Sequence, residues 1–173
     1  MIAGVAFIVA APAGGNDISP HAAGSSLPFE CANPIGAAST SQELAGPGAI
    51  GVPGVMAISI SVIGSNTIHW GGGASYQGLQ FAKGGLVLKA GTAFTLSVPA
   101  EMHGTMLIGW SNSGYILAHS LTIPGCTSSQ PDADWLAYPG GFWLKASGCV
   151  PLTVTQERSS RTIHVPVGMP CPA

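Results

Sequence analysis

Methionine and histidine side chains gather in one short segment where they could hold a metal ion. Met102, His103 and Met106 fall within five residues, and His164 adds a second imidazole further along the chain. Soft thioether and imidazole ligands suit copper. Met102, His103, Met106 and His164 therefore define an alternative function, a copper-binding or redox protein of the cell envelope. The simpler interpretation is that the methionines pack in the core and the histidines lie on the surface.

A second group of residues that could have a function is a cluster of aromatic side chains. Trp135, Tyr138, Phe142 and Trp143 fall within nine residues, and Lys145 follows. If Phe142 points into the core, strand alternation places Trp143 and Lys145 on the solvent side. An exposed tryptophan binds sugar rings or partner proteins well, because its large flat ring loses little entropy on binding. We therefore predict a ligand-binding face of Trp135, Tyr138, Trp143 and Lys145. The alternative is that these rings cap the end of the domain.

Catalytic residues are present without a catalytic motif. The segment Gly109-Trp110-Ser111-Asn112-Ser113 fails the G-x-S-x-G pattern of a nucleophile elbow at its last position. Asp132, Asp134 and His119 could still join a serine in space, so a hydrolase is the third interpretation. Residues 46–51 match G-x-G-x-x-G, but no strand is expected before them and no acid occurs between Glu43 and Glu101, so they predict no dinucleotide site. We expect a protein that is not an enzyme and has no cofactor.

Four cysteines indicate an oxidising compartment. An even number in an exported chain predicts two disulfides, for which three pairings exist. We expect Cys126 to pair with Cys149, because both lie at strand ends around one compact segment, and Cys31 to pair with Cys171. The spacing of the four does not fit the C-x2-4-C pattern of a structural zinc site.

The N-terminus resembles an export signal. Residues 1–13 contain a 12-residue apolar run, Ile2–Ala13, that ends in the small-x-small pattern Ala11-Pro12-Ala13. The basic start of a signal peptide is missing, since the first basic residue is Lys83. A buried strand or a short helix is the alternative for this segment. With the cysteines, it predicts a secreted or cell-envelope protein with no membrane span in the mature chain.

The composition excludes several classes of protein. Only 7% of the 173 residues are charged, five Lys and Arg against seven Asp and Glu, while 28 are Ser or Thr. Five scattered bases cannot form the basic surface that nucleic acids require. With 46% hydrophobic residues and a net charge of −2, the chain is not disordered. The surface must be solvated largely by uncharged hydroxyl groups.

Alternation of apolar and small polar residues predicts the elements that carry these side chains. Residues 14–53 are rich in Gly, Ala, Ser and Pro without periodicity, and we interpret them as an arm or linker. From residue 54 to residue 173 period-two strands follow, separated by glycine-rich turns, among them Gly71-Gly72-Gly73. The clearest strands are 56–62, 94–98, 150–154 and 163–169; weaker ones are 67–70, 85–89, 105–110, 115–123 and 141–146.

These strands predict an all-β fold, a two-layer antiparallel β-sandwich of immunoglobulin-like architecture with about seven to nine short strands and two disulfides. Pro166 cannot donate a main-chain hydrogen bond, so its strand should lie at a sheet edge. We expect a non-catalytic exported module that binds a ligand or forms a structural surface, its partner a glycan or another envelope protein.

Overall fold

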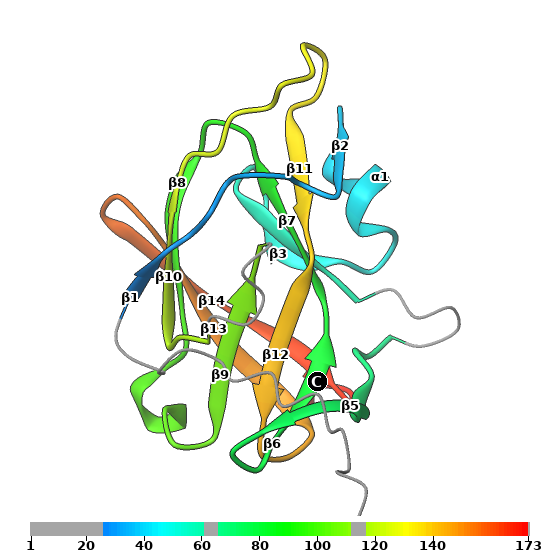
Figure 1. Cartoon of the computed structure of the whole chain (residues 1–173), viewed down its shortest axis with the longest axis vertical. Helices are drawn as coiled ribbons and strands as arrows, with labels where there is room; N and C mark the ends of the chain where they lie inside the picture. Colours follow the sequence, from blue (N-terminus) through cyan, green and yellow to red (C-terminus); the bar gives the residue numbers. More distant parts are fainter. Residues whose placement is uncertain (1–25, 61–65, 112–116, 173) are drawn as a thin grey trace, which may run out of the picture.

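The computed structural model describes residues 26–60, 66–111 and 117–172 (Figure 1). One short helix, α1 (Ser41–Ala45), and one 3-10 turn (Ala100–Met102) accompany the strands. The strands are β1 (Ser26–Pro28), β2 (Gly36–Ala38), β3 (Ile50–Val52), β4 (Met56–Ser59), β5 (Trp70–Tyr76), β6 (Leu79–Lys83), β7 (Gly85–Lys89), β8 (Ala93–Ser97), β9 (Met106–Trp110), β10 (Ser120–Pro124), β11 (Trp135–Tyr138), β12 (Gly140–Leu144), β13 (Gly148–Gln156) and β14 (Ser159–Val167).

The strands form two layers. The first layer is one five-stranded sheet of order β1-β10-β8-β13-β14. The second layer consists of two sheets, β2-β11-β7-β4-β3 and β5-β6-β12-β9. These two are continuous at a bend, since β6 leads into β7 through Gly84 and β11 leads into β12 through Pro139, as the yellow-to-orange ribbon in Figure 1 shows. The predicted β-sandwich is confirmed.

Glycine makes the bend of the second layer possible. At Gly141 a Cβ atom would lie 2.0 Å from the main-chain oxygen of Ala82, and at Gly140 it would lie 2.2 Å from that of Gly109. Gly140 also has a φ of 149°, in the region that favours glycine. The Gly84 N–H donates to the Gly140 carbonyl at 3.1 Å, which joins the two halves of the layer. Main chains therefore approach at the bend more closely than side chains would allow.

The inward residues of both layers form the main core. In β8, Phe94 and Leu96 are buried, while Thr95 and Ser97 face outward. The same alternation appears in β4 and β13, and in β14 it holds from Ile163 to Val165, after which Pro166 is buried as well. The four strands predicted most clearly are therefore present. Strand β14 lies at the edge of its sheet, as Pro166 predicted, and the Pro166 carbonyl accepts a hydrogen bond from the Ile68 N–H at 2.8 Å.

Residues 26–52 are not the loose arm expected from their composition. Strand β1 pairs in parallel with β10, β2 pairs with β11, and β3 pairs with β4. Each of the three strands has only three residues, too few for an alternating pattern to be visible in the sequence. Strands β6 and β11 were also not predicted. The described part of the chain therefore contains fourteen strands, where about seven to nine were expected.

Both disulfides form, but the predicted pairing is wrong. The bonds join Cys31 to Cys126 and Cys149 to Cys171. Because β1 runs parallel to β10, the segments that follow the two strands leave the sheet at the same end. The Cα atoms of Cys31 and Cys126 therefore lie close together, 5.3 Å apart. Cys149 faces Pro166 across the β13–β14 pair, which brings it near the segment that contains Cys171. The bonds indicate an oxidising, extracytoplasmic environment.

Residues 1–25, and with them the signal-like segment 1–13, lie outside the described part of the chain. Among the residues described, no helix has the length and apolar character needed to cross a membrane.

Candidate binding site

Trp143 is buried, so its predicted exposure is wrong. Only 5% of its surface is accessible. The parity argument was sound, because Phe142 packs in the main core and Trp143 points to the opposite face of β12. That face is itself covered by a second apolar cluster, in which the indole packs on Leu107 and on the Phe81 ring at a centroid distance of 5.1 Å. The indole N–H has no hydrogen-bond partner in the described residues.

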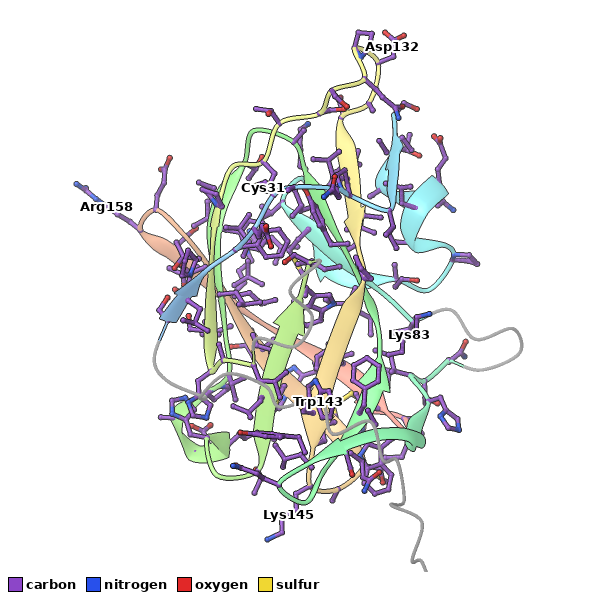
Figure 2. The ribbon with its side chains drawn as sticks, in the orientation of Figure 1. Cys31, Lys83, Asp132, Trp143, Lys145 and Arg158 are labelled. Carbon is purple, nitrogen blue, oxygen red and sulfur yellow. A yellow bond between two sulfur atoms is a disulfide. The ribbon has the colours of Figure 1, made fainter. Side chains whose placement is uncertain are left out.

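The other three residues of the predicted aromatic face point in different directions. Trp135 is half-buried on the outer face of β11, in a third cluster with residues of α1 and β7. Lys145 follows the end of β12 and is exposed, at the bottom of Figure 2. Tyr138 is fully buried, and its hydroxyl donates to the Cys31 carbonyl at 2.9 Å. The four side chains therefore do not form one exposed surface.

Burial also fixes the ionisation of Tyr138. Desolvation raises the pKa of its phenol above the ordinary value of 10. The phenol therefore stays protonated under physiological conditions and serves as a hydrogen-bond donor within the fold.

The four candidate copper ligands are divided between the core and two surface positions. Met106 is fully buried in the main core, and Met102 packs against that core. His103 follows β8 on the 3-10 turn, whereas His164 is exposed on β14, which β13 separates from β8. Within residues 26–60, 66–111 and 117–172, no group of three or more His, Cys, Asp and Glu side chains is arranged to hold a metal ion.

The residues considered for a hydrolase are also separated. Asp132 and Asp134 are exposed in the loop between β10 and β11, with Asp132 at the upper tip of Figure 2. His119 lies just before β10, where its ring stacks on that of His103 and its Nε2 lies 2.9 Å from the His103 carbonyl.

A groove at the bend of the second layer combines an apolar wall with polar side chains, as was expected of the predicted aromatic face. It has a volume of about 560 Å³, within the usual range of ligand sites of about 300–1,000 Å³. Its apolar wall is supplied by four side chains: Ile35, which directly precedes β2 and is 67% exposed, Leu44 of α1, Phe81 of β6 and Val87 of β7. Its polar groups are Lys83 at the end of β6, His69 before β5, and Ser59 at the end of β4.

The local conformation of β5 opens this groove. Gly71 and Gly73 line it, and the pairing of β5 with β6 is irregular between Trp70 and Ser75. Gly71 has a φ of 79°, which is typical of a glycine in a bulge. The sequence interpretation of residues 71–73 as a turn was wrong, because they belong to β5.

Among its described lining residues the groove has a positively charged side chain and no negatively charged one. Lys83 is exposed beside it, and none of the described lining residues is an aspartate or a glutamate. Figure 2 places Lys83 on the right of the molecule, well separated from Lys145. A cation, an imidazole and an apolar wall thus lie together, an arrangement suited to holding a small molecule.

No protein family, no curated protein and no solved structure matches this chain. Its candidate site is therefore defined by its own geometry.

Among the described lining residues, Tyr138 is the one predicted from the sequence as a site residue, and its side chain is buried; none of the others was predicted as a site residue. Ile35, His69 and Lys83 are far apart in the chain and match no motif. Only the irregular meeting of β2, β5 and β6 places them around one hollow. A further signal available in the sequence was the ring of Phe81, which is separated from Lys83 by a single residue and so shares its strand parity.

Proposed function

We propose that this protein is an exported, non-catalytic binding module of the cell envelope or the extracellular space, built on an immunoglobulin-like sandwich, and that its ligand occupies the groove at the bend. The two disulfides support export. The signal-like segment 1–13 remains a prediction from sequence.

One observation carries the proposal: the groove pairs an apolar wall with Lys83 and His69, and none of its described lining residues is acidic. The Lys83 ammonium attracts an anion, and the imidazole of His69 can donate a hydrogen bond to it. The exposed Ile35 and the ring of Phe81 provide surface for an apolar body. The fitting ligand is a small organic anion with an aromatic or aliphatic body.

Isothermal titration of the full chain with 1-naphthoate tests the proposal, with neutral 1-naphthamide as the matched ligand. A hydrogen bond to a charged group contributes about 1.5–3 kcal/mol, so we expect naphthoate to bind at least about tenfold more tightly than the amide. Lys83→Gln should remove this difference.

Lys145→Gln is the control, because it deletes the same charge at an exposed site away from the groove. It should bind both ligands as the wild type does. Equal affinity of wild type and Lys83→Gln for naphthoate, or no saturable binding of either ligand, would contradict the proposal.

A further inference from the structure

A second hollow lies in the other layer, beside two stacked histidine rings. The imidazoles of His103 and His119 are nearly parallel, with centroids 3.9 Å apart and an interplanar angle of 6°. The Nε2 atom of His103 lies 3.1 Å from the Val98 carbonyl, and that of His119 lies 2.9 Å from the His103 carbonyl. Main-chain atoms therefore fix the orientation of both rings.

These hydrogen bonds determine which ring nitrogen remains available. A carbonyl oxygen only accepts, so each Nε2 carries the proton and donates it. In the neutral imidazole the Nδ1 atom then keeps its lone pair and acts as an acceptor. In that form each of the two rings offers its Nδ1 atom to a ligand as a hydrogen-bond acceptor.

Three serine hydroxyls complete the hollow, which has a volume of about 360 Å³. Ser26, Ser97 and Ser120 come from β1, β8 and β10, and no Asp, Glu, Lys or Arg is among the described lining residues. Each hydroxyl can donate one hydrogen bond and accept others. Ser97 already donates to the Thr153 carbonyl at 3.4 Å, and Ser26 is hydrogen-bonded to the Thr122 hydroxyl at 2.9 Å, so these two have accepting capacity left for a ligand. The hollow therefore matches a neutral ligand that presents hydroxyl groups of its own.

The same serines begin a row of hydroxyls that crosses the whole sheet. In the register of the first layer, Ser26 lies opposite Ser120, Ser120 opposite Ser97, Ser97 opposite Thr153, and Thr153 opposite Thr162. With neighbouring strands about 4.8 Å apart, this row is roughly 19 Å long. Thr122, Thr95, Thr155 and Ser160 form a second row beside it in the same register.

Within its five strands this outer face carries no Asp, Glu, Lys or Arg side chain, and His164, opposite Pro151, is its one imidazole. The only Asp, Glu, Lys or Arg within β1, β8, β10, β13 and β14 is Arg161, which lies opposite the buried Val154 and so has the parity of the inner face. An anionic polymer would gain no opposite charge there, and it would lose solvation of its own. A neutral polymer loses no ionic solvation and can exchange its water contacts for the hydroxyl rows.

We infer that the hollow of His103, His119, Ser26, Ser97 and Ser120 holds one sugar ring of a neutral polysaccharide, and that the chain of the polysaccharide continues along the hydroxyl rows. The rows present hydroxyl groups, which can donate and accept, at strand spacing, and so they can form hydrogen bonds with the hydroxyl groups of such a polymer. This site is independent of the groove, which lies in the other layer.

Sedimentation with insoluble polysaccharides tests the inference. The full chain is mixed with cellulose, chitin and a neutral β-glucan, and with calcium alginate as the anionic comparison. We expect at least one neutral polysaccharide to retain the protein in a saturable manner. Ser120→Glu places a carboxylate in the hollow, and His119→Ala removes one acceptor and the ring stack. Either change should lower the binding constant at least about tenfold.

Ser129→Glu is the matched control, since it makes the same substitution on the exposed loop between β10 and β11. It and Lys83→Gln should be retained like the wild type, and thermal unfolding should show that all variants are folded. Retention by none of the neutral polysaccharides, retention by alginate alone, or unchanged retention of folded Ser120→Glu and His119→Ala would each overturn the inference.

Discussion

The indole of Trp143 packs against the ring of Phe81 at a centroid distance of 5.1 Å, on the side of β12 that faces away from the main core. Strand β12 therefore has a buried aromatic residue on each face, Trp143 on the outer side and Phe142 on the inner side. Phe81 also lines the groove. The second apolar cluster thus supports the wall of the proposed ligand site.

Removing the Trp143 side chain should destabilise the protein strongly. Trp143→Ala leaves a cavity in the second cluster, and we expect a loss of about 3–5 kcal/mol in the free energy of unfolding. Trp143→Phe should cost less than half as much, because it keeps an aromatic ring and removes an N–H that has no partner in the described chain. Denaturant unfolding of both variants checks this. A loss below about 1 kcal/mol for Trp143→Ala would show that the indole is exposed in solution.

The two disulfides should contribute unequally to stability. The Cys31–Cys126 bond has a sequence separation of 95, and the Cys149–Cys171 bond has one of 22. In the chain-entropy account the longer loop contributes about 4.7 kcal/mol and the shorter about 3 kcal/mol. Each bond is deleted by a paired Cys→Ser change, and denaturant midpoints are compared. Peptide mapping without reduction verifies the pairing, and a Cys126–Cys149 peptide would contradict the structure.

The buried phenol of Tyr138 should make stability fall at high pH. Its pKa is raised in the folded state, so above pH 10 the unfolded chain loses this proton while the folded chain still holds it. The contribution of the protonated Tyr138 phenol to the free energy of unfolding is complete below pH 10. It is lost as the pH rises through the pKa of the folded state. Tyr138→Phe should flatten this part of the stability curve and cost about 1 kcal/mol at neutral pH, because the hydrogen bond to Cys31 is lost. An identical pH profile for both proteins would contradict this assignment.

The bend of the second layer should not tolerate a side chain at Gly141. A Cβ there meets the Ala82 oxygen at 2.0 Å, so Gly141→Ala should cost at least about 3 kcal/mol or prevent folding. Gly104→Ala is the control, since no atom beyond its own residue and its two chain neighbours lies within 4 Å of its Cβ position. Thermal melts of the two variants provide the comparison, and equal melting temperatures would show that the bend relaxes.

The sequence was informative about strands that have one buried face and one solvent-exposed face. Phe94 and Leu96 alternate with Thr95 and Ser97, so β8 and the outer face of its sheet could be predicted. The sequence was uninformative about three-residue strands, whose stability depends on main-chain pairing with a distant strand. The Cys31–Cys126 bond depends on such a strand, β1, and was missed for that reason. The exposure of Trp143 was predicted wrongly because alternation identifies the face of a strand on which a residue lies. It does not show whether other side chains cover that face.

The candidate site was less predictable than the fold. The aromatic cluster was visible only as neighbours in sequence, and the fold turns Trp135 and Tyr138 to opposite faces of β11. The groove gathers Ile35, His69 and Lys83 from three segments whose meeting depends on the bulge in β5.

The most direct test of the binding-module account is the chemical-shift map of the labelled full chain titrated with 1-naphthoate. The account predicts saturable shifts of the amides and side chains of Ile35, His69, Phe81 and Lys83, with Lys145 unchanged. Shifts confined to other regions, or none at saturating ligand, would contradict it.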